Sequence, residues 1–113
     1  MAPEAEDPRR VEFLYWSECP SWERALQILR EEVEAAGLNP AAIGVEEVRE
    51  DERAAELGFP GSPTIRVGGR DIQDPGQEPI GLTCRVYRLR DGRASPLPDR
   101  ADVHDALQAL GAA

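Results

Sequence analysis

A strand pattern gives way to a helix pattern at Cys19-Pro20. Residues 11–16 are a β-branched and aromatic run, which predicts a mostly buried strand ending at Ser17. Pro20 suits the first turn of a helix because no partner is needed there for its missing N–H, and Gly37 closes that helix. Five apolar residues share one face of the helix: Ala25, Leu26, Leu29, Val33 and Ala36. A thiol therefore stands at a strand-to-helix turn.

The middle of the chain predicts a strand, a short helix and another strand. Residues 43–49 have strand character, and their glutamates favour a place at or near the sheet edge. Asp51 can cap a short helix over residues 52–57. Gly61-Ser62-Pro63-Thr64, about 40 residues after Cys19, leads into an alternating strand over 64–67.

The last third predicts one more strand and a final helix. Residues 81–89 form the fourth strand, with Leu82, Cys84 and Val86 on one face. The polar stretch that precedes it is long for a hairpin connection. Asp99 then caps an amphipathic helix.

The resulting order is β-α-β-α-β-β-α in one domain over residues 10–112, after a disordered lead-in at 1–9. The first two strands are expected to pair in parallel through a right-handed crossover, and the last two to form an antiparallel hairpin. This predicts an α/β fold with a mixed four-stranded sheet and helices on both faces.

The amino-acid composition limits the kinds of partner that the protein is expected to bind. A net charge of −9 argues against nucleic-acid binding, because no basic patch survives such an excess. All 13 basic residues are arginine, which excludes lysine Schiff-base chemistry. The acidic start does not resemble a signal peptide, and no apolar run approaches the roughly 20 residues that span a bilayer. We therefore expect a cytoplasmic protein with no membrane partner and reduced cysteines.

Cys19 is the candidate catalytic residue. The unpaired N–H groups and partial positive charge of a helix N-terminus stabilise a thiolate, although Glu18 and Glu23 work against it. Trp16 and Trp22 flank the thiol and are candidates for an apolar rim, with a core position for Trp22 as the alternative. The alternative for Cys19 itself is a buried cysteine that serves only as a cap and core filler.

These motifs resemble a thioredoxin-like family over roughly residues 10–112. The resemblance is carried by Cys19-Pro20 at the helix start, Gly61-Ser62-Pro63-Thr64, and the later Leu-Thr-Cys-Arg-Val-Tyr run at 82–87. The combination looks like a group of small bacterial thioredoxin-like proteins, some of which carry the label alkylmercury-lyase-like. The resemblance implies a cis Ser62-Pro63 bond, whose Ser62 backbone lies beside the thiol and can pair with an incoming peptide or thiol ligand.

The sequence departs from that family at Trp22, which stands where a dithiol site carries its second cysteine. The expected function is then a monothiol redox protein in which Cys19 forms mixed disulfides with a protein or a low-molecular-weight thiol. Pro20, Ser62 and Pro63 would line the substrate groove with the two tryptophans, and no cofactor is expected.

Cys84 has two interpretations. Its apolar neighbours on the strand favour a buried core position, and hairpin geometry does not favour a direct approach to Cys19, although the long connection could shift the register. It stays a candidate resolving thiol. His104 is expected at the surface, and two cysteines and one histidine cannot complete a four-ligand zinc site.

Two other functions remain open. One is a non-catalytic thioredoxin-like binding module. The other is the handling of a thiophilic metal or organomercurial, which requires Cys19 and Cys84 to converge.

Overall fold

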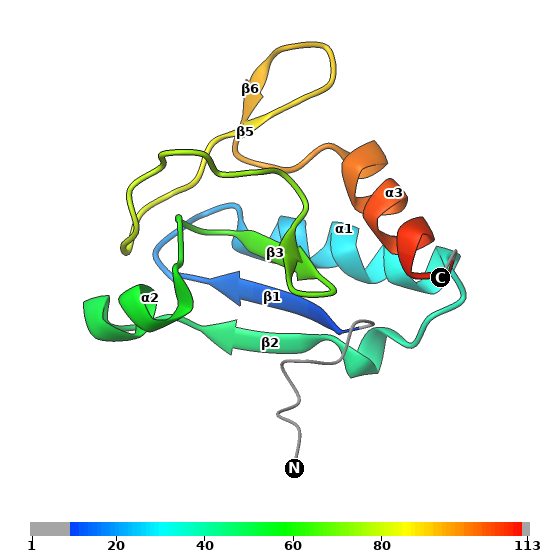
Figure 1. Ribbon diagram of the computed structural model, residues 1–113, viewed down its shortest axis with the longest axis horizontal. Helices are drawn as coiled ribbons and strands as arrows, with labels where there is room; N and C mark the ends of the chain where they lie inside the picture. Colours follow the sequence, from blue (N-terminus) through cyan, green and yellow to red (C-terminus); the bar gives the residue numbers. More distant parts are fainter. Residues whose placement is uncertain (1–9, 112–113) are drawn as a thin grey trace.

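The computed structural model describes residues 10–111, and a four-stranded mixed sheet in the order β2-β1-β3-β4 lies at its centre (Figure 1). β1 (Val11–Tyr15) pairs in parallel with β2 (Gly44–Glu47) and antiparallel with β3 (Thr64–Val67), and β3 pairs antiparallel with β4 (Arg70–Asp71). The parallel pairing of the first two strands and the edge position of the second are therefore confirmed.

Helices pack on both sides of β1. Phe13 belongs to a buried cluster with residues of α1 (Trp22–Ala35) and α3 (Arg100–Gly111), whereas Leu14 packs with Ala54 of α2 (Asp51–Leu57). Adjacent strand residues point to opposite faces, so one strand serves both clusters. A short 3₁₀ helix, η2 (Pro40–Ala42), precedes β2. None of the helices within residues 10–111 is long and apolar enough to cross a bilayer.

The predicted helix boundaries agree with the structure to within about two residues. Gly37 follows α1 and Gly58 ends α2, both with positive φ angles, 79° and 61°. Asp99 caps α3, because its carboxylate accepts the backbone N–H of Ala101 at 3.0 Å. The predicted lead-in at 1–9 and residue 112 lie outside the described residues.

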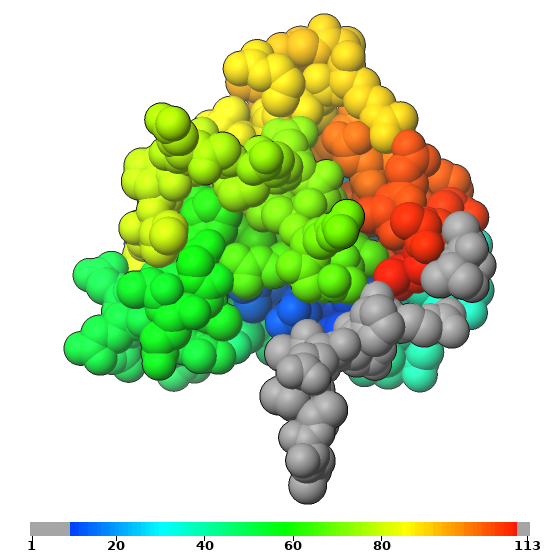
Figure 2. All heavy atoms as spheres, viewed as in Figure 1, coloured from blue at the N-terminus to red at the C-terminus, as the bar shows by residue number. Residues whose placement is uncertain are grey.

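The predicted fourth strand over 81–89 is wrong. Within it only β5 (Tyr87–Arg88) is a strand, and it pairs with β6 (Ala94–Ser95) in a separate hairpin that projects at one end of the molecule (Figures 1 and 2). The turn at Gly68-Gly69, with φ angles of 61° and 83°, reverses the direction of the chain immediately after β3. β4 therefore occupies the edge of β3 before residues 81–89 are reached.

The predicted apolar face of that segment is also wrong. Cys84 and Val86 are exposed, Val86 by 58%, whereas Arg85 and Tyr87 are buried. The buried polar groups have partners. Arg85 forms a two-pronged ion pair with Asp71 of β4, at 2.7 and 3.0 Å, and the Tyr87 hydroxyl donates to the Pro63 carbonyl at 2.6 Å. These satisfied contacts outweigh the alternation of apolar residues.

Candidate functional site

Cys19 lies in the turn between β1 and α1, as the sequence predicts. Its backbone N–H donates to the carbonyl of Trp16 at 3.0 Å, which closes the turn. Its side chain is 1% exposed, although Pro20, the next residue, is exposed. The turn thus holds the thiol inside the protein at the entrance to a helix.

Two serines surround the Cys19 sulfur. The Ser21 hydroxyl lies 3.2 Å from it, and the thiol itself donates to the Ser62 carbonyl at 3.4 Å. The Ser62 hydroxyl accepts the N–H of Trp16 at 3.0 Å, so its own proton is free to point at the sulfur. The two hydroxyl groups can donate to a thiolate, whereas the Ser62 carbonyl accepts only from the protonated thiol.

Burial raises the pKa of Cys19, but hydrogen bonds outweigh it, and the pKa lies below the usual thiol value. The donors are the hydroxyl and backbone N–H of Ser21, then the Ser62 side chain and Cys84. A thiolate that accepts several hydrogen bonds is stabilised even where water is largely excluded.

The Ser62-Pro63 peptide bond is cis, as predicted. The backbone of Ser62, however, is already paired within the protein. Its N–H donates to the Thr83 carbonyl at 2.8 Å, and its carbonyl accepts the N–H of Arg85 at 2.8 Å. The chain's own segment therefore occupies the edge that was expected to receive an incoming peptide.

Cys84 lies between Thr83 and Arg85, which make those two contacts, and it forms a parallel β-bridge with Ser62. Both cysteines are free and they meet at Ser62, whose carbonyl accepts the Cys19 thiol and whose backbone forms the bridge with Cys84. The pKa of Cys84 is raised above the usual value, first by partial burial and then by the interaction with Cys19. The hairpin that was expected to separate the two cysteines does not form, because residues 83–85 pair with Ser62 instead of with β3.

Two features hold the Cys84 segment in place. The Arg85–Asp71 ion pair ties the segment to β4. Gly61 allows the close approach, since a Cβ there would lie 3.2 Å from Arg85 and from the Thr83 side chain. The sequence motifs include Gly61 and Arg85 but do not predict these contacts. The alternation of Arg85 with Tyr87 was a signal that polar groups could face inward.

The tryptophans do not form one rim. Trp22 stacks on Tyr15, with ring centroids 4.1 Å apart, and packs against the cluster of α1 and α3. Trp16 packs against the other cluster, together with Leu82. Both are partly buried, and Trp22 makes an aromatic contact with Tyr15 of the sheet.

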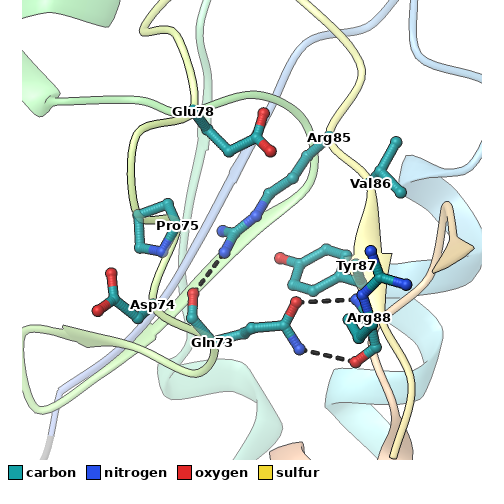
Figure 3. Close-up of a pocket in the computed structure, with 8 residues that line it drawn as sticks. All are labelled: Gln73, Asp74, Pro75, Glu78, Arg85, Val86, Tyr87 and Arg88. Carbon is teal, nitrogen blue, oxygen red and sulfur yellow. Dashed lines mark hydrogen bonds between the residues drawn. The ribbon is translucent and has the colours of Figure 1, made fainter. Parts of the chain in front are cut away.

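A pocket of about 180 Å³ lies beside Arg85 and Tyr87 (Figure 3). The Arg85 guanidinium stacks on the Tyr87 ring and also donates to the Gln73 carbonyl (Figure 3). Because Asp71 neutralises this arginine, Arg85 itself offers no free positive charge to an anion in the pocket.

No group of three or more acidic, histidine or cysteine side chains with metal-site geometry occurs among residues 10–111. His104 lies at the surface near Glu32, with 3.7 Å between Nδ1 and the carboxylate, as expected from the sequence. Cys19 and Cys84 both contact Ser62, so this residue marks the candidate site in the described chain.

No protein-family model matches this chain, and no curated protein or solved structure is detectably similar to it.

Proposed function

We propose that the protein is a thioredoxin-like thiol–disulfide exchange protein whose working pair is Cys19 and Cys84. The observation that carries the proposal is that both free cysteines meet at Ser62, through the Cys19 thiol and the Cys84 bridge, and that hydrogen bonds lower the pKa of Cys19. The sequence alone favoured a monothiol site. Cys84 supplies the second sulfur that Trp22 cannot.

The scaffold supports the same proposal. The parallel β1–β2 pair, the antiparallel β1–β3 pair and the thiol ahead of α1 match the arrangement expected of a thioredoxin-like protein. Ser62 contacts both sides of the site, because its carbonyl accepts from the Cys19 thiol and from the backbone N–H of Arg85.

The chemistry is a two-electron exchange. The thiols of Cys19 and Cys84 join in one disulfide, and an external disulfide RSSR is reduced to two thiols. A mixed disulfide on one cysteine is the intermediate, and the other cysteine displaces RS⁻ from it. The reverse sequence reduces the protein pair with two equivalents of RSH.

The test is to treat the reduced protein with glutathione disulfide and to measure its mass. We expect wild type to lose two hydrogen atoms and to keep no glutathione, because the second thiol resolves the adduct. Cys19→Ser and Cys84→Ser should each be unable to form the internal disulfide. A stable glutathione adduct on wild type, or two unreacted thiols, would refute the dithiol proposal and favour a binding module.

A second candidate function rests on the same convergence. Two adjacent thiols are a suitable two-coordinate site for a thiophilic metal such as Hg²⁺. Titration with inorganic Hg²⁺ should show one equivalent bound, with affinity lost in either single-cysteine variant. Equal affinity in wild type and in both variants would rule out a shared site.

A further inference from the structure

The two thiols differ in access to solvent. Cys19 is 1% exposed and lies under the contacts from Ser21 and Ser62, whereas Cys84 is exposed. Thiol–disulfide exchange requires the attacking and attacked sulfurs to meet, so access limits which cysteine can react with a molecule from outside. In this protein the external partner meets Cys84.

We propose that Cys84 is the cysteine that exchanges with the external disulfide, and that buried Cys19 resolves the mixed disulfide formed on Cys84. This inference rests on the proposed function and assigns an order to its two steps. It reverses the expectation from the sequence, in which Cys19 attacks and Cys84 resolves.

Each step balances. Cys84 attacks one sulfur of RSSR, a Cys84–SR bond forms, and the S–S bond of RSSR breaks. With Cys19 first ionised to the thiolate by loss of its proton to solvent, the Cys84 proton passes to the Cys19 sulfur and then to the departing RS⁻, and the second RS⁻ takes its proton from solvent. Cys19 thiolate next attacks the Cys84 sulfur, forming the Cys19–Cys84 bond and releasing the second RS⁻. The protein loses two electrons and RSSR gains them.

The environment of Cys19 suits a cysteine that reacts only with Cys84 and not with an external molecule. In the reverse direction an external thiolate attacks the exposed Cys84 sulfur, and Cys19 is the leaving group. Thiols of lower pKa leave faster, and after burial is counted the hydrogen bonds from Ser21 and Ser62 still lower the pKa of Cys19. The same contacts hold the sulfur beside Cys84 in both directions.

The geometry also indicates the class of substrate. Thr83 and Arg85 occupy both backbone groups of Ser62, so an extended peptide cannot pair there without displacing the protein's own segment. A low-molecular-weight disulfide needs only the exposed Cys84 sulfur. Small disulfides are therefore the substrates this entry point favours.

One test measures the rates at which the two single-cysteine variants react with dipyridyl disulfide, an uncharged probe. Folded Cys19→Ser, which keeps Cys84, should react at least about tenfold faster than folded Cys84→Ser, because access outweighs thiolate fraction for a buried sulfur. The two variants should react at similar rates in denaturant. Equal rates in the folded state, or a faster Cys84→Ser, would overturn the proposed order.

A second test uses wild type. The oxidised protein is mixed briefly with reduced glutathione, quenched by alkylation and cleaved at arginine, which places Cys19 in peptide 11–24 and Cys84 in peptide 71–85. Glutathione should appear on 71–85 with alkylated 11–24, and glutathione on 11–24 would contradict the proposal. Before glutathione is added, a disulfide-linked pair of these two peptides would show that the internal disulfide has formed. This measurement tests the proposed function separately from the order of the two steps.

Discussion

Ser21 stands at the N-terminus of α1 but does not cap it. Its side chain makes no bond to the helix backbone; it contacts the Cys19 sulfur at 3.2 Å and donates to the Pro96 carbonyl at 3.4 Å. A serine at this position ordinarily satisfies one of the free N–H groups of the first turn. Here the capping hydrogen bond is replaced by one to the thiol, which links the helix start to the chemistry of the site.

Replacing Ser21 by alanine should raise the pKa of Cys19. In wild type the folded-state pKa lies below the ordinary thiol value, so Cys19 is ionised at pH values where a free thiol is not. Loss of one donor destabilises the thiolate and shifts its titration to higher pH. Thiolate absorbance measured in a Cys84→Ser background checks this, with exposed Ser17→Ala as the control. An unchanged titration curve would show that Ser21 does not stabilise the charge.

The segment that carries Cys84 is held by its neighbours rather than by a regular strand. Its two hydrogen bonds to Ser62 and the Arg85–Asp71 pair replace a full ladder. The close contact at Gly61, whose φ is 122°, makes this docking sensitive to a single added carbon. The position of Cys84 therefore depends on a residue more than 20 positions away in sequence.

Gly61→Ala should weaken the docking of residues 83–85. The added Cβ meets Arg85 and Thr83 at 3.2 Å, and the backbone conformation disfavours a side chain, so we expect a loss of about 1–3 kcal/mol in unfolding free energy. Formation of the Cys19–Cys84 disulfide should slow as well. Gly92→Ala is the control, since Gly92 also has a positive φ, 95°, but has open space around its Cβ position. Equal disulfide formation rates in both variants would contradict the role given to Gly61.

Oxidation of the pair should change the stability of the whole molecule. A Cys19–Cys84 disulfide would close a loop of about 65 residues, for which chain entropy predicts up to about 4 kcal/mol of stabilisation. Strain reduces that figure, so it is an upper limit.

Thermal unfolding followed by circular dichroism, with and without reductant, measures the effect. Oxidised wild type should have the higher Tm, and Cys84→Ser should show no dependence on reductant. If reduced and oxidised wild type unfold at the same temperature while mass spectrometry shows the disulfide, the thiols are not preorganised for bonding.

Much of the fold could be predicted because its signals are local. The apolar run at 11–16, the helical spacing after Pro20 and the glycines that end helices each act within a few residues. The segment at 81–89 could not be predicted in this way, because its alternation pointed to a strand with Cys84 inside. The buried partners of Arg85 and Tyr87, Asp71 and the Pro63 carbonyl, lie elsewhere in the chain and reverse that orientation.

The sequence by itself determined that a thiol stands at a strand-to-helix turn and that Ser62-Pro63 precedes a neighbouring strand, since both depend on short-range propensities. Only the tertiary structure decided that Cys84 and Cys19 meet at Ser62. That meeting depends on the tight Gly68-Gly69 turn, which gives the sheet edge to β4, and on the hydrogen bonds that draw residues 83–85 to Ser62. Such long-range pairings have no local signature, because the free energy that selects them comes from contacts between distant segments.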